Sequence, residues 1–458
     1  MPIKPTFTVS GYRGVWGDTM NTEIASLYAR AFIKFLKHDQ ENIRPKILIG
    51  RDGRESGPEI KEAIIKELIK YGVDFIDGEI LPTPTVMFSV RKHSYDGAII
   101  ITASHNPIEY NGLKFVNNKA FFLEESEAQR INEYIQDLED MLADRTPGTF
   151  INEVMEIPNF TKEHADKIAS SVDKELIRSK NYKVAVDMIN ASACEVDPYL
   201  FGELGVELIP FNNIPNGKFG HKPEPNEANL IDIADFVKHS KVDLGFAHDP
   251  DADRLVVIDE NGKVVFEEYT LALCVENILS QNPKQKVAIN LSTSRMSLDI
   301  AEKYEGTGYM AKIGEPNVVK EIIKNNTIIG GEGNGGVIYP TVNLARDSFI
   351  GIALILELLA KRDQKVSEII ATLPKHFMKK AKYPMTEALD KKIAKLKEHF
   401  SDAESIEIDG VRLDFPDKAW LHLHPSNTEP IFRLYGEAST EERIDALFKE
   451  AELTFDSN

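Results

Sequence analysis

The chain of 458 residues is 42% hydrophobic and 28% charged, which is ordinary for a soluble globular protein, and its length predicts about three or four domains. Its formal net charge of −19 argues against a nucleic-acid partner and against an anionic membrane surface, because both bind a basic face. No apolar run approaches the roughly 20 residues that cross a bilayer, and MPIKPTFTVSGYRG lacks the apolar block of a secretory signal. The two cysteines, Cys194 and Cys274, lie among apolar residues and are interpreted as core thiols, so we expect a cytoplasmic protein without a membrane partner.

The N-terminal third begins with a strand followed by a crossover helix. KILIGRDGRESG, from residue 46, is a short apolar run that ends in a polar turn. Residues 58–72 follow with Ile60, Ile64 and Leu68 at helical spacing. A second apolar run, DGAIIITASHNP at 96–107, ends in a loop of hydrogen-bonding residues. This order is typical of a buried parallel strand, a helix and a second strand.

The same order of segments occurs twice more along the chain. YKVAVDMINASA from residue 182 is followed by VDLGFAHDPDADR at 242–254, and QKVAINLSTSR from 285 is followed by NTIIGGEGNGG at 326–336. Strands that alternate with helices predict three similar α/β domains with mixed, largely parallel sheets. Because ligands bind beyond the carboxyl ends of such strands, we expect each domain to contribute one polar loop to a site.

After about residue 375 the pattern changes. KHFMKKAKYPMTEALDKKIAKLKEHF is interpreted as a basic linker that leads into an amphipathic helix. SIEIDGVRLDF, WLHLHP and IFRLYGEA predict strands before a final helix, STEERIDALFKEAE, so this part is predicted to be a smaller C-terminal α+β domain with mostly antiparallel strands. Boundaries near 153, 257 and 374 give four predicted domains, at residues 1–153, 154–257, 258–374 and 375–458.

Ser104 ends the second strand of the first predicted domain, and His105, Asn106 and Lys114 follow it. A serine hydroxyl is a poor nucleophile unless a base or a metal activates it. A phosphoserine, in contrast, can bind a divalent cation and transfer its phosphoryl group. The neighbouring side chains offer donors or proton relays. Taken singly, the same residues could be a turn serine, a surface histidine and a solvated lysine.

Asp249, Asp251 and Asp253 alternate in HDPDADRLVVIDE, so in an extended segment their carboxylates point the same way. Three adjacent carboxylates repel unless a cation lies among them, and oxygen ligands favour Mg²⁺ or Ca²⁺. Glu260 would be the twelfth ligand of a calcium-binding EF-hand, but Arg254 stands where that loop needs glycine. We therefore predict a divalent metal site, shared with Ser104 at the edge of the neighbouring domain.

Two further loops suggest ligand binding. GGEGNGG has five glycines between 330 and 336, so its backbone can approach a ligand while Glu332 and Asn334 bind vicinal hydroxyls; a tight structural turn is the alternative. It is not a Walker A loop, because the following Lys-Ser or Lys-Thr is missing. HPSNTEPIFRLYGEA offers a cluster of donors that suits a phosphate better than a simple ST-turn, namely Ser426, Asn427, Thr428 and Arg433.

These four loops, in this order, resemble those of the α-D-phosphohexomutases, which include phosphoglucomutases, phosphomannomutases and phosphoglucosamine mutases. TASHNP resembles the family's phosphoserine loop, DPDADR its metal loop, GEGNGG its sugar loop and PSNTEP its distal phosphate loop. SGYRG, with Arg13, is similar to the family's opening element, so the resemblance covers nearly the whole chain. It implies three similar α/β domains and a smaller fourth one around a central cleft.

The resemblance also implies a reaction and the residues that perform it. A phosphoserine at Ser104 gives its phosphoryl group to a hexose phosphate, and the resulting hexose 1,6-bisphosphate, which also acts as activator, turns over and returns the other phosphate. Mg²⁺ is held by Ser104 and the three aspartates. The other residues implied are catalytic (Lys114, His105 and Arg13), sugar-binding (Arg254, Lys312, Glu332 and Asn334) and phosphate-binding (His424, Ser426, Asn427, Thr428 and Arg433).

The chain departs from the family at two loops. The common sugar loop is Glu-x-Ser-Gly-His, but here Asn334 and Gly336 replace the serine and the histidine. The distal loop usually begins with arginine, where this chain has His424. GEGNGG is most similar to the phosphoglucosamine mutase branch, so we expect glucosamine 6-phosphate and glucosamine 1-phosphate as substrates, with a phosphoglucomutase/phosphomannomutase as the alternative.

A non-catalytic sugar-phosphate sensor and a calcium-binding structural module are the rival classes, and the sequence leaves a monomer and a homodimer open.

Overall fold

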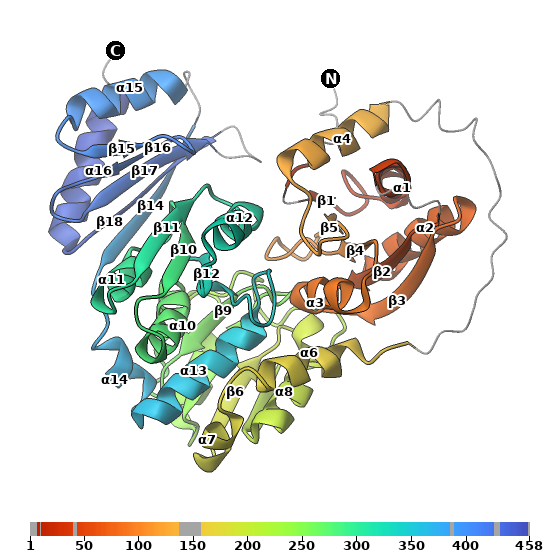
Figure 1. The fold of residues 1–458 in the computed structure, drawn as a ribbon, viewed down its shortest axis with the longest axis horizontal. Helices are drawn as coiled ribbons and strands as arrows, with labels where there is room; N and C mark the ends of the chain where they lie inside the picture. The colour runs from red at the N-terminus through yellow and green to blue at the C-terminus, as the bar shows by residue number, and fades with distance from the viewer. Residues whose placement is uncertain are drawn as a thin grey trace.

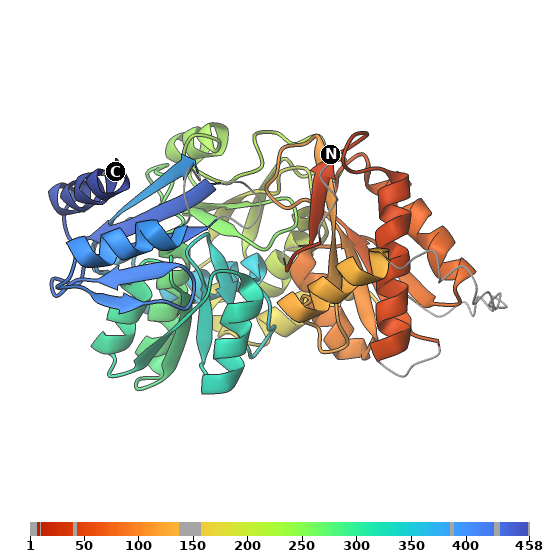
Figure 2. The same cartoon turned by 90° about the horizontal axis from the view of Figure 1, so that it is seen from above.

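Four β-sheets follow one another along the chain in the computed structural model, which describes residues 7–9, 11–39, 44–136, 157–384, 389–425 and 431–456 (Figures 1 and 2). We call the part around each sheet a unit, numbered from first to fourth. In Figure 1 the first unit, in red and orange, and the fourth, in blue, lie on opposite sides, with the second and third units between them. None of the helices in the described ranges is long and apolar enough to cross a membrane.

The first unit has a five-stranded sheet in the order β1-β5-β4-β2-β3. Strands β2, β3 and β4 are parallel, whereas β5 and β1 run antiparallel to their neighbours. Its elements are β1 (Tyr12–Val15), α1 (Thr22–Asp39), β2 (Lys46–Arg51), α2 (Gly57–Lys70), β3 (Asp74–Ile80), α3 (Thr83–His93), β4 (Gly97–Ile101), β5 (Tyr110–Val116) and α4 (Glu125–Gln136).

The second and third units repeat this arrangement with four strands each, in the orders β7-β6-β8-β9 and β11-β10-β12-β13. The second contains α6 (Phe160–Ala169), α7 (Lys174–Ser179), β6 (Lys183–Asp187), η1 (Ser192–Glu195), α8 (Asp197–Leu204), β7 (Glu207–Phe211), α9 (Ile231–His239), β8 (Leu244–His248) and β9 (Leu255–Ile258). The third contains α10 (Glu268–Gln281), β10 (Lys286–Asn290), α11 (Met296–Lys303), β11 (Thr307–Ala311), α12 (Glu315–Asn325), β12 (Ile329–Glu332), β13 (Gly336–Ile338), α13 (Ser348–Arg362) and α14 (Val366–Ile370). In each, three parallel strands end in one antiparallel strand, so the prediction of three similar, largely parallel α/β sheets is confirmed.

A side-chain turn at the end of one parallel strand, β2, β6 or β10, is shared by the first three units. An aspartate or asparagine accepts a bond from the backbone N–H two residues on, which turns the chain and fixes the polar loop. The three bonds run from Arg54 N to Asp52 Oδ1 (3.0 Å), from Ile189 N to Asp187 Oδ1 (2.9 Å) and from Ser292 N to Asn290 Oδ1 (2.9 Å). The repeat therefore extends from the order of the strands to individual side chains.

The fourth unit is a five-stranded antiparallel sheet in the order β14-β18-β17-β16-β15, as expected for the α+β domain. It contains β14 (Phe377–Pro384), α15 (Leu389–His399), β15 (Glu404–Ile406), β16 (Val411–Asp414), β17 (Trp420–Pro425), β18 (Ile431–Ala438) and α16 (Glu441–Asp456). The interpretation of the basic stretch from 375 as a linker is wrong, because most of it is the edge strand β14. Its lysines suit an edge that must not pair with another chain.

The hydrophobic cores show which units form one body. The second and third units share a core, whose helices α10 and α13 are apolar on nearly every side and almost wholly buried. The first and fourth units have cores of their own, and a smaller cluster on the other face of the first sheet also includes Phe160 and Ala345 of the second and third units. Of the predicted domain boundaries, 153 lies outside the described residues, 257 falls within β9, and 374 falls between α14 and β14.

Candidate active site

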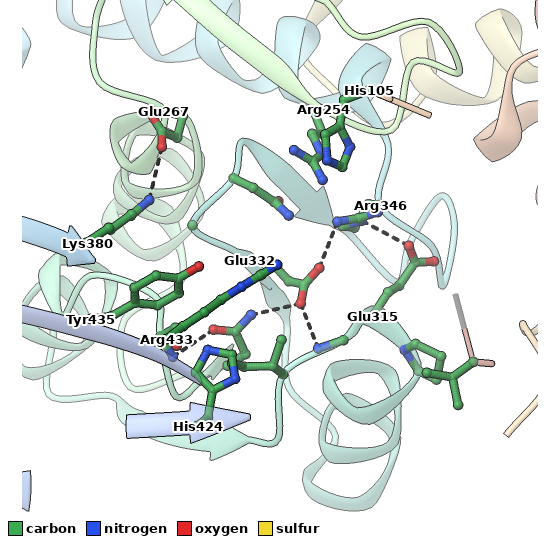
Figure 3. Close-up of a pocket in the computed structure, with 18 of the residues that line it drawn as sticks. His105, Arg254, Glu267, Glu315, Glu332, Arg346, Lys380, His424, Arg433 and Tyr435 are labelled. Atoms are coloured by element: carbon green, nitrogen blue, oxygen red, sulfur yellow. Dashed lines mark hydrogen bonds and ion pairs between the residues drawn. The ribbon is translucent and has the colours of Figure 1, made fainter. Parts of the chain in front are cut away.

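A cavity of about 510 Å³ is lined by residues from all four units (Figure 3). The loops after the strands β4, β8 and β12 supply one part of its wall, as expected from the common carboxyl-terminal edge of the three sheets. The fourth sheet closes the opposite side. The lining residues that concern the chemistry are Arg13, His105 and Lys114 from the first unit, Glu224 and Arg254 from the second, Glu315, Glu332, Asn334 and Arg346 from the third, and Lys382, His424 and Arg433 from the fourth.

Ser104 lies beside the acidic loop of the second unit. Its hydroxyl donates to Asp249 Oδ2 at 3.1 Å and lies 3.3 Å from His105 Nδ1. Its backbone has φ of 51°, in the left-handed region that residues other than glycine seldom adopt. Its N–H donates to Thr102 Oγ1 at 2.8 Å, which holds this unusual conformation. The hydroxyl is therefore aimed across the boundary between two units, and strain of this kind is common at active sites.

A single buried guanidinium, that of Arg54, fixes the backbone of the serine loop. It donates to the carbonyl oxygens of Ser104, Asn106, Pro107 and Tyr110, each at 2.7 or 2.8 Å. Asp52, the turn residue after β2, accepts from Arg54 Nε at 3.1 Å. Five donors in a fixed fork can satisfy several carbonyls at once, which no other side chain can do. Arg54 thus positions the loop from beneath, although it does not line the cavity.

The three aspartates form a buried cluster that fits a metal ion. Their oxygens lie within 4.8 Å of one another, and in the described part of the chain Oδ1 of Asp251 and of Asp253 has no hydrogen-bond partner. Burial, and then the neighbouring carboxylates of Asp253 and Asp251, raise the pKa of Asp249 well above its ordinary value. Oxygen ligands without partners, packed this closely, need a cation to stay charged together. The residues present therefore suit Mg²⁺.

Lys114 supplies part of the positive charge at this cluster. Its Nζ lies 2.6 Å from Asp251 Oδ2 and 3.6 Å from Asp253 Oδ2, and all three side chains are buried. Thr83 also donates to Asp251 Oδ2, at 2.7 Å. Burial alone would raise the pKa of Asp251, but Lys114 and then Thr83 bring it below its ordinary value. Lys114 is therefore not a solvated strand lysine but an element of the cluster.

Arg346 joins the metal loop to the sugar loop, as Figure 3 shows for two of its three partners. Its guanidinium contacts Asp253 Oδ2 at 2.5 Å, Glu332 Oε2 at 2.8 Å and Glu315 Oε2 at 3.0 Å. Glu332 is also held through Oε1, which accepts from Asn290 Nδ2 at 2.8 Å and from the backbone N–H of Gly314 at 3.0 Å. The carboxylate predicted to bind sugar hydroxyls is thus fixed from both sides.

A second group of cations lines the cavity near the serine. Arg13 donates to Asn106 Oδ1 at 2.7 Å, and Arg254 donates to Glu224 Oε1 at 3.0 Å. In Figure 3 Arg254 and His105 lie side by side. Burial, and then Arg254 and Arg13, lower the pKa of His105 well below its usual value, so its ring is neutral at pH 7. Two arginines and a neutral imidazole thus lie at the serine loop.

Three family models match the chain, with the descriptions "Phosphoglucomutase/phosphomannomutase, alpha/beta/alpha domain I", "domain II" and "domain III", over residues 4–141, 162–262 and 267–377. The chain belongs to the α-D-phosphohexomutase family. This phosphohexomutase is 36% identical to a phosphoglucomutase/phosphomannomutase of Thermococcus kodakarensis, over 95% of each chain, and 34% identical to a probable phosphoglucosamine mutase of Pyrococcus abyssi, over 97% of this chain and 96% of the other. A crystal structure of a phosphoglucomutase/phosphomannomutase family protein from Burkholderia thailandensis matches with a TM-score of 0.85 and 27% identity, covering 100% of this chain and 99% of that one.

The predicted site residues of this phosphohexomutase are not all brought together. The structure places Ser104, His105, Lys114 and the three aspartates in one cluster. Ser104 and the aspartates are buried and do not line the cavity; the predicted residues that line it are Arg13, His105, Lys114, Arg254, Glu332, Asn334, His424 and Arg433. Lys312 is exposed and does not line it, although the residues that follow, 313–316, do. Ser426, Asn427 and Thr428 lie outside the described residues.

Sequence reasoning missed three residues that hold this site together. Arg54 is in the quoted turn GRDGRESG, but nothing in one sequence shows that it reaches the serine loop. Glu315 stands in KIGEP without any motif spacing. Arg346 precedes Asp347, whose carboxylate accepts from the N–H groups of Phe349 (3.0 Å) and Ile350 (3.3 Å) and so caps α13. An aspartate before a long apolar run is a helix-start signal that would have placed Arg346 at the edge of the sheet.

Proposed function

We propose that this phosphohexomutase interconverts hexose 6-phosphates and hexose 1-phosphates through a phosphoserine at Ser104 and a hexose 1,6-bisphosphate, which also serves as activator. The contact that carries the proposal is the 3.1 Å hydrogen bond from the Ser104 hydroxyl to Asp249. It joins the predicted phosphoryl carrier of one unit to the acidic cluster of the next. Both groups are buried, and their neighbours His105, Lys114 and Arg254 line a cavity that is rich in cations.

The side chains divide the work of phosphoryl transfer as follows. Asp249, Asp251, Asp253 and the phosphoserine would hold Mg²⁺, which would supply positive charge to the transferring group. The bond between phosphorus and the serine oxygen breaks while phosphorus bonds to the C1 or C6 oxygen of the sugar. Arg13 and Arg254 neutralise phosphate oxygens, and Lys114 keeps the acidic cluster charged. Transfer of this kind depends on positioning and charge more than on covalent chemistry.

Two groups can move the proton of the attacking hydroxyl, and they differ in charge. His105 is neutral and can accept it directly, whereas Lys114 is already engaged by Asp251 and Asp253. His105→Gln and Lys114→Met distinguish them through the pH profile of kcat. If His105 accepts the proton, its replacement removes the acidic limb of that profile. If Lys114 moves the proton, the acidic limb of the pH profile remains in His105→Gln and changes only in Lys114→Met.

The substrate we propose is glucosamine phosphate. Its C2 ammonium would meet a cavity wall with the acidic side chain of Glu332, and several relatives at 30 to 34% identity are named probable phosphoglucosamine mutases. Glucose or mannose phosphate is the second candidate, because the 36% identical relative is named a phosphoglucomutase/phosphomannomutase. A coupled assay of glucosamine, glucose and mannose phosphates side by side, primed with bisphosphate, decides between them. The hexose phosphate with the highest kcat/KM is the preferred substrate.

A non-catalytic sensor and the location of the protein are tested by separate experiments. A sensor would bind sugar phosphates without turnover at any bisphosphate concentration, but Ser104, Lys114 and the three aspartates are all in place, which supports an enzyme. We also propose a reducing, cytoplasmic setting, because both cysteines are free thiols. Cell fractionation checks this location.

A further inference from the structure

Three basic side chains form a row across the fourth sheet. Lys382 of β14 is the direct antiparallel partner of Arg433 of β18, and Arg433 is in turn the partner of His424 of β17. Direct partners on neighbouring strands point to the same face of a sheet. All three line the cavity. The row therefore gathers two permanent cations and an imidazole at the wall opposite the serine loop.

The next row along the same face serves a different purpose. It consists of Lys380, Tyr435 and His422, which are again direct partners. Lys380 contacts Glu267 at 3.0 Å and Glu268 at 3.7 Å, and Figure 3 shows the first of these ion pairs. His422 is hydrogen-bonded to Ser292 Oγ at 2.8 Å. Lys380 and Tyr435 also line the cavity, but Lys380 and His422 of this row tie the fourth unit to the third.

The row of Lys382, Arg433 and His424 suits a phosphomonoester. Such a group carries a charge of about −1.5 to −2 at pH 7, so one arginine does not neutralise it. Burial lowers the pKa of His424, so this side chain offers a hydrogen bond and no charge at neutral pH. A second permanent cation has to come from elsewhere, and in this row the second cation is Lys382.

We propose that Lys382, with Arg433 and His424, binds the phosphate of the hexose phosphate that is not undergoing transfer at Ser104. The inference rests on the proposed function for its ligand, a phosphomonoester, and adds a residue on β14 to the phosphate site. Because the intermediate presents either of its phosphates to this row in turn, one set of cations serves both directions of the reaction. A flexible lysine on an edge strand tolerates the two orientations better than a rigid fork does.

The test compares Lys382→Ala with Lys379→Ala by calorimetric titration with glucosamine 6-phosphate in the presence of Mg²⁺. Lys379 lies on the same strand, but it faces the other side of the sheet and contacts Asp445 at 2.5 Å. Loss of a charge-assisted contact should raise Kd about tenfold in Lys382→Ala. Lys379→Ala should bind like the wild type, and Lys382→Arg should recover most of the affinity. KM should rise with Kd, while kcat at saturation changes little.

Each outcome separates this inference from the proposed function. Equal Kd values for Lys382→Ala, Lys379→Ala and the wild type, in an enzyme that turns over, overturn the role of Lys382 and leave the mutase intact. A wild type without turnover on any of the three hexose phosphates contradicts the proposed function, but the Kd comparison still reports on Lys382. Thermal unfolding of each variant identifies a folding defect, and Lys382→Gln then replaces Lys382→Ala.

Discussion

The two ends of the cavity are built in different ways. At the end where transfer takes place, Ser104 and Lys114 are 1% and 4% exposed and the three aspartates are wholly buried. At the distal end, Lys382 is exposed and Arg433 is half-buried. The first end is held by repeated α/β units, and the second is one face of an antiparallel sheet with its own core. The difference indicates that the reacting groups are preorganised, while the distal cations become desolvated only when ligand covers them.

The comparison predicts that substitutions at the transfer end reduce kcat and that those at the distal end raise KM. Ser104→Ala should have the largest effect. Without the phosphoryl carrier, kcat should fall to background, about a millionfold, which is the scale expected when a nucleophile is lost. Mass spectrometry of the wild type should show a phosphate adduct on the peptide 101–115, and none in the variant.

The matched control is Ser89→Ala in α3, where another buried serine of the same unit donates to the carbonyl of Thr85 at 2.7 Å, away from the cavity. This variant should keep its turnover and its phosphate adduct. If Ser104→Ala interconverts sugar phosphates as fast as Ser89→Ala, the phosphoserine mechanism is wrong.

Asp249→Asn should change activity and stability in opposite directions. Burial and two neighbouring carboxylates raise the pKa of Asp249, so its charged form destabilises the metal-free protein at neutral pH, above the ordinary pKa of an aspartate. In EDTA the variant should therefore unfold at a higher temperature than the wild type. Mg²⁺ should raise the unfolding temperature of the wild type and leave that of the variant nearly unchanged, and kcat in Mg²⁺ should fall about a thousandfold. Calorimetric scans with and without Mg²⁺ measure both effects, and equal Mg²⁺ stabilisation of the two proteins would contradict the metal site.

Arg54→Lys tests whether the transfer end depends on a residue outside the cavity. A lysine cannot reach four carbonyl oxygens, so the serine loop should lose its fixed backbone and kcat should fall about ten- to a hundredfold with little change in KM. Arg51→Lys is the control, because Arg51 ends β2 just before the turn that carries Arg54, but contacts the Asp52 carbonyl oxygen at 3.3 Å and the exposed Glu79 carboxylate at 3.4 Å rather than the serine loop. Steady-state kinetics of the two variants compare them, and an equal loss in both would show that the effect is not specific to the loop.

The sequence predicted the polar loops better than the residues that support them, for physical reasons. Apolar strands that end in Ser104 or in alternating aspartates are strong local signals, and repetition of the unit placed those loops at one edge. Arg346 and Glu315 act through contacts between segments far apart in the chain, which one sequence does not display. Strand β14 was missed because it lies at the edge of its sheet and alternates between exposed and half-buried residues rather than between polar and apolar ones. The lysines of β14 that line the cavity were therefore interpreted from the sequence as part of a charged linker.

The smallest expected effect comes from His424→Arg at the distal end, where the family usually has an arginine. The variant places a third permanent cation in the row with Arg433 and Lys382, so phosphomonoester binding should tighten by about three- to tenfold. The same change puts like charges on neighbouring strands, so without ligand the unfolding temperature should fall slightly. Titration with glucosamine 6-phosphate and thermal scans with and without it measure both quantities. A variant that binds glucosamine 6-phosphate no tighter, or that gains stability in the absence of ligand, would show that the row does not gather charge for a phosphate. The two ends of the cavity would then differ only in burial.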